Sequence, residues 1–250
     1  AVRQQIESAI INSKLRAVLV GAPGVGKTLM ARRLAREFAR KHPRRNSQWV
    51  SATASAKDIP FGAFSHLIDM AGGDEPTTLL RAARESLRDA APHGLILVVD
   101  DAHQLDTLSA TLVHQLAGDG DVAIILTVRE GEAVPDAVTA LWKDDILARH
   151  DIVPFVLEET RLLLEQTLGG PIEDVSTARM FDVSQGNPLY LRHLLEAALS
   201  TGSLRQVEGV WQLRGEMTLS AGLSTLIDQH LVGLPPPVRA VLEFLAIEEP

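Results

Sequence analysis

Cysteine is absent from this chain of 250 residues, and aromatic residues make up only 4% of it. Without cysteine, disulfides, thiolate metal sites and cysteine nucleophiles are excluded, and a cytoplasmic location is the simplest expectation. No apolar run approaches the roughly 20 residues of a membrane helix, so we expect no membrane association. The few aromatic residues are scattered, so no platform for stacking nucleic-acid bases is visible.

The chain also has fewer basic residues than acidic residues. The chain holds 24 Lys and Arg against 32 Asp and Glu, a formal net charge of −8. An acidic surface repels nucleic acid at long range, so the chain is a poor candidate for a main DNA contact. One basic cluster lies between Arg36 and Arg45, where a solvated helix end favoured by the helix dipole explains it. Contact with nucleic acid is the alternative.

Strands and helices alternate over the first part of the chain. The run Leu95–Val99 is apolar at every position, which is typical of a parallel strand covered on both faces. This alternation predicts a doubly wound α/β domain with a parallel sheet. The expected strands cover residues 16–20, 48–51, 95–99, 122–128 and 151–153, and the expected helices cover 1–13, 27–41, 78–91 and 107–117.

The pattern changes near residue 156. From there to about Leu199 it predicts helices only, with a break at Gly186-Asn187-Pro188. Proline suits the first turn of the next helix, because its missing N–H is harmless there. A small hairpin is expected across Leu204–Leu213, and two further helices over 223–231 and 238–247.

A glycine-rich segment, Gly21–Thr28, matches the pattern G-x-x-x-x-G-K-[ST] of a P-loop, or Walker A motif. Its glycines let backbone N–H groups surround phosphate oxygens, and the following helix adds the positive end of its dipole. Lys27 would contact the β and γ phosphates, and Thr28 would give a hydroxyl to Mg²⁺. The expected nucleotide-binding residues are Gly21, Ala22, Pro23, Gly24, Val25, Gly26, Lys27, Thr28 and Leu29.

Two aspartates follow the apolar strand 95–99 directly, where a P-loop protein carries its Walker B motif. Asp100 would hold Mg²⁺ through water, together with Thr28. Asp101 would orient or deprotonate an attacking water. The alternative is that the pair only caps the loop.

Three further side chains are weaker candidates. Arg129 ends the next strand, and its guanidinium could reach the γ-phosphate; a surface arginine is the alternative. Arg149 could be a finger toward a neighbouring subunit, although a solvated role is favoured. For His103, a structural or supporting role is favoured over catalysis.

Taken together, these motifs resemble a known family, the ATPase core of the STAND class of AAA+-related proteins. More narrowly, the chain is similar to the large ATP-binding LuxR-type transcriptional regulators. The resemblance covers nearly the whole chain and follows the order of its motifs. These are the P-loop, then I-P-F-G-A-F at Ile59–Phe64, L-I-L-V-V-D-D-A-H at Leu95–His103, T-V-R at Thr127–Arg129 and G-N-P-L-Y-L-R-H-L-L at Gly186–Leu195.

The resemblance implies a three-part organisation. Residues 1–155 would form the P-loop core, 156–201 a helical lid, and 202–250 a hairpin with the truncated start of a winged-helix domain. Arg129 would be the family's sensor, and Pro188 would pack near the adenine. The G-R element that usually precedes the first helix is missing, which puts the adenine pocket in doubt.

The resemblance also implies a function. It predicts a slowly hydrolysing switch, in which exchange between ATP and ADP controls conformation and assembly, with an inducer, a partner protein or self-association. DNA would be bound only by a helix-turn-helix beyond Pro250. Two alternatives remain open: an AAA+ motor or loader with ring-based turnover, and a non-hydrolysing nucleotide-binding module.

Overall fold

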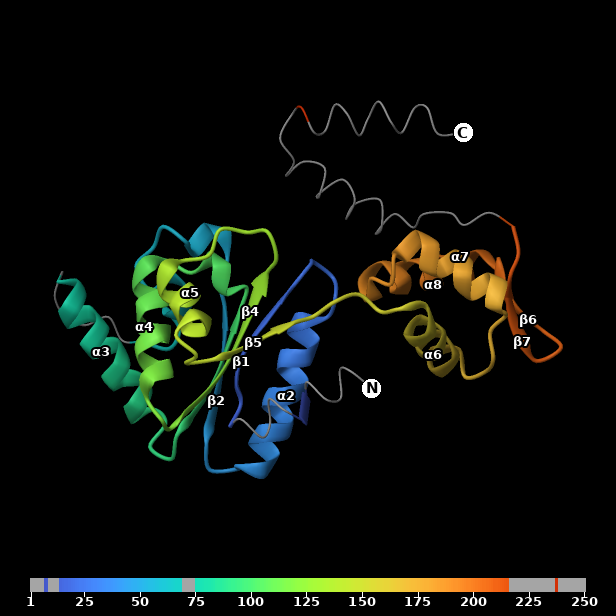
Figure 1. The fold of residues 1–250 in the computed structure, drawn as a ribbon. Helices are drawn as coiled ribbons and strands as arrows, with labels where there is room; N and C mark the ends of the chain where they lie inside the picture. The colour runs from blue at the N-terminus through green and yellow to red at the C-terminus, as the bar shows by residue number, and fades with distance from the viewer. Residues whose placement is uncertain (1–6, 9–13, 69–74, 216–236, 238–250) are drawn as a thin grey trace. The chain divides into compact units, whose positions relative to one another are not determined.

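Figure 1 shows the fold in a computed structural model, which describes residues 7–8, 14–68, 75–215 and 237. The chain divides into two units, Ala1–Val153 and Pro154–Pro250. Apart from residues 7 and 8, which are helical, the helix expected over 1–13 lies outside the described residues. The helices expected over 223–231 and 238–247, and with them the expected start of a winged-helix domain, also lie outside.

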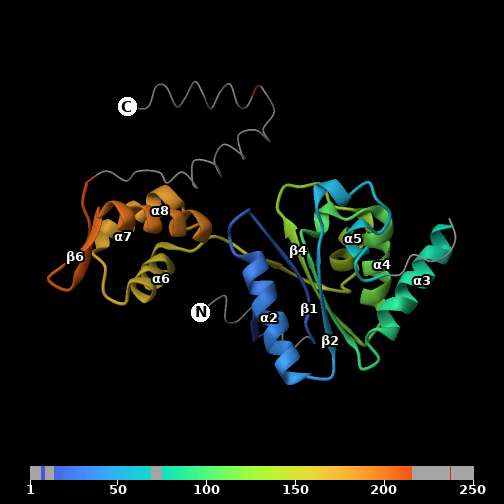
Figure 2. The same ribbon diagram turned by 180° about the vertical axis from the view of Figure 1, so that it is seen from behind.

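Five parallel strands form the sheet of the first unit (Figures 1 and 2). Their order is β2-β3-β4-β1-β5, so β4 lies between β3 and β1. The end of β4 therefore lies between the end of β1, which leads into the P-loop, and the end of β3, which carries Asp100. The strands are β1 (Arg16–Gly21), β2 (Asn46–Ser51), β3 (Leu95–Asp100), β4 (Val122–Arg129) and β5 (Ala148–Asp151).

Both faces of this sheet are covered, which confirms the predicted α/β fold. Along β3, Ile96 and Val98 pack in one core cluster with α2 (Lys27–Lys41). Leu97 and Val99 point the other way, into the cluster that holds the remaining helices. Those helices are α3 (Pro76–Asp89), α4 (Thr107–Gly118) and α5 (Asp136–Lys143), with short 3₁₀ turns at Ala54–Ala56, Gly62–Phe64 and Ala102–Gln104.

Two elements of the first unit differ from the sequence prediction. Helix α5 was not expected; it has only eight residues and buries two apolar side chains, Val138 and Leu141. The last strand was expected over 151–153, but β5 covers Ala148–Asp151. It pairs with β1 on one side only, so an edge strand with exposed side chains suffices and no apolar run marks it.

The described part of the second unit, up to residue 215, contains three helices and a hairpin. The hairpin strands are antiparallel, and Glu208 and Gly209 join them with φ of 51° and 84°, as a tight two-residue turn requires. Leu204 and Leu213 of the hairpin pack in one cluster with helix residues such as Met180, so no separate core marks the expected boundary at 201/202. The elements are α6 (Leu157–Leu168), α7 (Asp174–Ser184), α8 (Pro188–Thr201), β6 (Leu204–Val207) and β7 (Val210–Leu213).

The break between α7 and α8 has a local structural reason. Gly186 has φ of 69°, and a Cβ there would lie 1.9 Å from the carbonyl oxygen of Phe155. The Phe155 N–H in turn donates to the Gly186 carbonyl oxygen at 2.9 Å. Asn187 then caps α8, accepting from the Leu189 N–H at 3.0 Å, and Pro188 occupies the first turn. The sequence G-N-P therefore joins a close backbone contact to a helix start.

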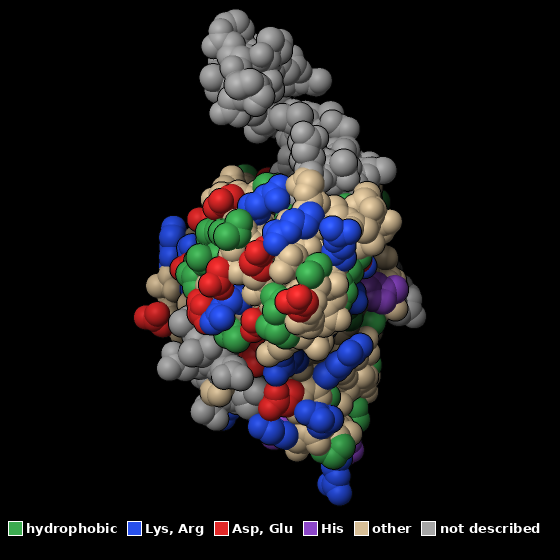
Figure 3. All heavy atoms as spheres, turned by 90° about the vertical axis from the view of Figure 1, so that its right-hand side faces the viewer, with side chains coloured by type: hydrophobic (Ala, Val, Ile, Leu, Met, Phe, Trp, Pro, Cys, Tyr) green, Lys and Arg blue, Asp and Glu red, His purple; other side chains and the backbone are tan. Residues whose placement is uncertain are grey.

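Charged side chains of both signs are interspersed over the face of the molecule in Figure 3. Among the described helices, none combines the length and apolar character that crossing a membrane requires.

Candidate nucleotide-binding site

The P-loop connects β1 to α2, and its glycines are needed where they stand. Gly24 and Gly26 have φ of 79° and 97°, a region that other residues rarely adopt. Gly21 has a different reason, because a Cβ there would lie 2.3 Å from the Ile152 carbonyl oxygen. No side chain caps the start of α2 at Gly26. A helix start of this kind, following a curled backbone, suits an anion such as a phosphate.

Lys27 lies across the inside of this loop. It is only 6% exposed, and its ammonium donates to the carbonyl oxygens of Gly21 at 2.8 Å and Ala22 at 2.9 Å. Burial lowers the pKa of Lys27, and the nearby Asp101 carboxylate partly opposes that shift. The loop therefore holds a desolvated cation close to the helix start.

Thr28 and Asp100, predicted as the metal pair, lie together. The Thr28 hydroxyl donates to Asp100 Oδ1 at 2.9 Å, although 71 residues lie between them in the chain. A hydroxyl and a carboxylate are the oxygen ligands that Mg²⁺ prefers when phosphates complete its shell. The phosphate cradle, the buried lysine and this oxygen pair therefore fit a nucleotide with Mg²⁺.

Thr127 was not predicted as a site residue, yet it connects both aspartates. Its side chain is fully buried. Its hydroxyl donates to Asp100 Oδ1 at 2.6 Å and accepts from the Asp101 N–H at 2.9 Å. The available signal was that Thr127 is the single hydroxyl in an otherwise apolar strand, Val122–Val128.

Asp101 and Arg129 form a two-point ion pair. Arg129 Nη2 lies 3.0 Å from Asp101 Oδ2, and Arg129 Nε lies 3.3 Å from Oδ1. Asp101 has φ of 54°, an unusual conformation for a residue with a side chain. The structure therefore brings the expected base and the expected sensor into direct contact.

His103 lies close to both members of this pair, with its Nδ1 4.0 Å from Asp101 Oδ1. It is 1% exposed, and its Nδ1 accepts a long hydrogen bond of 3.5 Å from the Arg129 N–H. Burial lowers the pKa of His103, partly opposed by Asp101. Within the part of the chain that the structure describes, its Nε2 has no hydrogen-bond partner. This contact with the backbone of Arg129 is a supporting one.

Three other candidates, Leu29, Arg149 and Pro188, remain predictions. The Leu29 side chain is 73% exposed on α2. Arg149 pairs with Asp151 of its own strand at 2.8 Å. Pro188 belongs to the second unit, so its contact with adenine remains a prediction.

The segment Ile59–Phe64 packs into the hydrophobic core of the first unit. Phe61 and Phe64 are fully buried. Asp106 Oδ1 accepts from the Phe61 N–H at 3.2 Å and from the Leu108 and Ser109 N–H groups at 3.0 Å, which caps α4. This motif therefore fixes the loop against α4.

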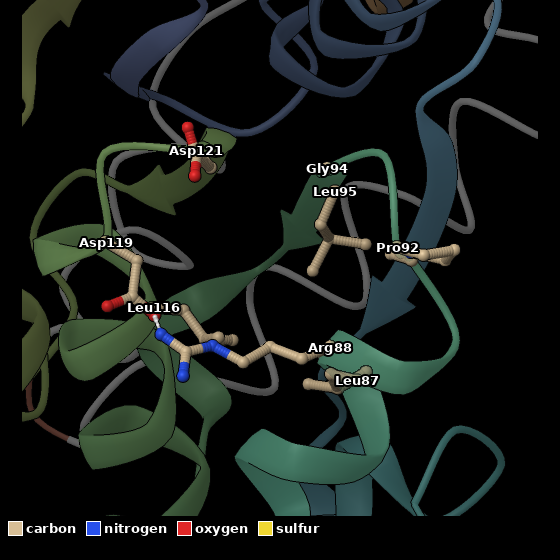
Figure 4. Close-up of a pocket in the computed structure, with 9 residues that line it drawn as sticks. Leu87, Arg88, Pro92, Gly94, Leu95, Leu116, Asp119 and Asp121 are labelled. Atoms are coloured by element: carbon tan, nitrogen blue, oxygen red, sulfur yellow. Dashed lines mark hydrogen bonds and ion pairs between the residues drawn. The ribbon is translucent and has the colours of Figure 1, made fainter.

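A cavity of about 260 Å³ lies at the other end of the strands, beside the start of β3 (Figure 4). It is lined by the end of α3, the start of β3 and the end of α4, and an ion pair of 3.0 Å joins Arg88 to Asp119 beside it. The P-loop follows the other ends of the parallel strands, so this cavity is not part of the nucleotide site.

The fold and this site define a P-loop nucleoside-triphosphate-binding protein. A sequence model of the AAA ATPase domain matches residues 1–128, and the chain therefore belongs to this family. The match ends directly before Arg129.

Solved structures agree with this assignment at the level of the fold. The Orc1 protein of Aeropyrum pernix, in complex with DNA, has a TM-score of 0.59 and 15% identity, covering 99% of this chain and 71% of Orc1. The RuvB Holliday junction branch migration motor of Thermotoga maritima has a TM-score of 0.52 and 14% identity, covering 97% of this chain and 74% of RuvB. No curated protein matches the sequence.

Proposed function

We propose that this AAA ATPase domain is the nucleotide-dependent switch of a bacterial transcriptional regulator of the STAND class and LuxR type. It binds ATP and ADP with Mg²⁺ through Gly21–Leu29 and hydrolyses ATP slowly. Exchange of the nucleotide changes its conformation and its assembly.

The ion pair between Asp101 and Arg129 is the observation that carries this proposal. Both carboxylate oxygens of Asp101 face one guanidinium, at 3.0 and 3.3 Å. A carboxylate held this way is not directed at an attacking water, because both of its oxygens face the guanidinium. A γ-phosphate would compete for Arg129 and release Asp101. The pair thus links the presence of ATP to the availability of the base, and it favours slow turnover.

The other residues have distinct roles in this proposal. Lys27 exchanges its two carbonyl contacts for phosphate oxygens, and the start of α2 binds them with backbone N–H groups. Thr28 and Asp100 hold Mg²⁺, which neutralises phosphate charge when bound. Thr127 keeps Asp100 in place, and Asp101 accepts the proton of the attacking water.

The second unit provides the part that changes. Pro188, at the start of α8, would contact the adenine. ADP would hold this unit closed, and ATP, with an inducer or partner protein, would open it for self-association. Both units would touch one nucleotide, so a difference in affinity is sufficient to shift the equilibrium. Specific DNA binding would belong to a segment beyond Pro250.

A motor is the second candidate, favoured by family membership and by the likeness in fold to the RuvB motor. A motor of this class would need an arginine reaching the site of a neighbouring subunit. Arg149, the candidate from the sequence, is paired with Asp151 of its own strand. A module that binds but never hydrolyses ATP is the third candidate.

Turnover measured against protein concentration separates the three. We expect a switch to hydrolyse ATP slowly, at a rate per protomer that changes less than about threefold on assembly. Light scattering should then show a different particle size with ATP than with ADP. Turnover that rises steeply with assembly would identify a motor. Tight ATP binding with neither turnover nor a change in size would identify the passive module.

A further inference from the structure

Basic residues are concentrated in one short segment of this acidic chain. Residues 32–45 hold seven of the 24 Lys and Arg and one of the 32 Asp and Glu. Their local charge is +6, whereas the rest of the chain carries −14. The net charge of −8 therefore conceals two regions of opposite sign.

The arginines of this segment follow a regular line along α2. Arg32, Arg36 and Arg40 are spaced four residues apart and are all exposed, and Arg44 follows beyond the helix end. Positions four apart lie on one face, with a rise of about 6 Å between them. The opposite face of α2 is buried in the core. Within this arginine line, Arg36 and Arg40 therefore face away from the core, whereas the Arg32 guanidinium lies over the Trp49 ring of β2, 4.8 Å from its centroid.

Few acidic groups neutralise the segment. Arg33 pairs with Glu7 at 3.5 Å, and Lys41 lies 3.7 Å from Glu37. Among the described residues, no ion pair within 4.0 Å involves Arg36, Arg40 or Arg44. These three side chains are therefore open to an external anion.

The needs of the helix itself do not explain this line. A helix dipole favours cations within its last turn, which accounts for Arg40 and Lys41 only. Arg32 and Arg36 lie further back, and like charges four residues apart destabilise a helix. The solvated helix end expected from the sequence thus explains part of the segment.

A hollow of about 300 Å³ continues the line beyond the helix. It is lined by Lys41, His42, Pro43, Arg44, Arg45 and His93. Arg45 is held in place, donating to the Asp121 carbonyl oxygen at 2.7 Å. A concave site with cationic walls is suited to one phosphate group. The arginine line on α2 is suited to the adjacent phosphate groups of the same polymer.

We propose that the arginine line of α2 and this hollow bind the phosphate backbone of a nucleic acid without reading its sequence. Guanidinium groups form two-point hydrogen bonds with phosphate, and arginine makes up six of the seven basic residues. A regular row of charges matches a polymer of phosphates better than an acidic protein surface, whose carboxylates have no fixed repeat. Along α2, Arg36 and Arg40 lie about 14 Å and about 20 Å from Lys27, so this part of the surface acts independently of the nucleotide site.

The test is fluorescence anisotropy of the 250-residue chain with a labelled 20-nucleotide DNA of scrambled sequence, single- and double-stranded. We expect micromolar binding at 50 mM salt, indifferent to sequence, with an affinity that falls steeply as salt rises. The triple variant Arg36→Gln, Arg40→Gln, Arg44→Gln should bind at least about tenfold more weakly. The slope of log affinity against log salt should become shallower by about two to three.

The matched control makes the same change in charge elsewhere, with Arg81→Gln, Arg192→Gln and Arg205→Gln. This control should bind DNA like the parent, and so should Lys27→Ala. Calorimetry with ATP on both triple variants separates this surface from the nucleotide site, since ATP affinity should be unchanged. An equal loss in the two triple variants, or no DNA binding by the parent, would overturn the proposal. Equal binding of a polyglutamate of the same length would also overturn it and indicate an acidic protein partner.

Discussion

The two ends of helix α2 both carry basic side chains, in opposite environments. At the first end, Lys27 is 6% exposed and is held by two carbonyl oxygens. At the other end, Arg40, Lys41 and Arg44 are exposed, and the Lys41 side chain is 57% exposed with one carboxylate at 3.7 Å. A buried, fixed cation suits one ligand in one geometry. Exposed cations act through charge density, which salt screens. One helix thus supports both a stereospecific site and an electrostatic surface.

The largest expected effect is at the buried end. Lys27→Ala should weaken ATP binding by roughly 2–5 kcal/mol, because a partly buried charge contact is lost. Isothermal titration calorimetry gives the affinity, and circular dichroism shows whether the variant is folded. Lys41→Ala, at the exposed end of the same helix, should bind ATP like the parent. Parent-like affinity in a folded Lys27→Ala protein would refute the assignment of the site.

ATP hydrolysis should depend on Asp101, the residue that follows the proposed metal ligand Asp100. Asp101→Asn should lower single-turnover hydrolysis by about 10²-fold, since an amide cannot accept the proton of the water. Its ATP affinity should stay within about twofold, because Lys27 and Thr28 are untouched. Glu130→Gln, an exposed carboxylate next to Arg129, is the control for loss of charge. An Asp101→Asn protein with the parent rate would show that another group arranges the water.

A smaller effect is expected for magnesium. Asp100→Asn should remove most of the roughly tenfold gain in ATP affinity that we expect from Mg²⁺, because the proposed site takes its protein ligands from Asp100 and Thr28. Binding of ATP without Mg²⁺ should change little. Calorimetry with and without Mg²⁺ measures both, and the nucleotide-free parent should show negligible Mg²⁺ binding. Tight binding of Mg²⁺ alone would contradict this assignment.

The smallest effect is on the free energy of unfolding and concerns His103. This side chain is buried like Lys27, but it contacts the backbone of Arg129 and is not expected to contact the nucleotide. Burial lowers its pKa in the folded state, so the unfolded chain binds the proton more readily. The free energy of unfolding should therefore fall as pH drops below about 6.5, by at most about 1.4 kcal/mol per pH unit. In His103→Asn this part of the slope should vanish, as urea unfolding at several pH values would reveal. His150, whose pKa burial also lowers, is the comparison: replacing it should leave the contribution of His103 in place.

The sequence predicted the elements whose signals are local. Helix α2 begins and ends at Lys27 and Lys41 as expected, because the P-loop fixes its start and an amphipathic pattern continues to its end. Strand β3 has an apolar run that only a doubly covered strand needs. The short helix α5 and the edge strand β5 bury few side chains, so neither carries such a pattern.

The site was predictable in its parts but not in its connections. In the sequence, Thr127 looks like an ordinary strand residue, because threonine is common in strands whether or not its hydroxyl has a role in a site. Its role depends on β4 lying between β3 and β1, which only the strand order reveals. The contact between Asp101 and Arg129 likewise joins the ends of two strands. The basic cluster between Arg36 and Arg45 was assigned to a solvated helix end, with nucleic-acid contact as the alternative, because the net charge of −8 argued against DNA. A net charge averages over the chain, whereas a ligand meets a local surface.

Two hydrogen bonds near residue 153 each close a loop within one unit. In the first unit the Ile152 N–H donates to the Val20 carbonyl oxygen at 2.7 Å, and in the second the Phe155 N–H donates to the Gly186 carbonyl oxygen at 2.9 Å. Closing such loops costs chain entropy, which only the packing of the rest of the unit repays. Hydrogen exchange at these two amides, only three residues apart in the chain, should therefore report the opening of the first unit and of the second unit separately.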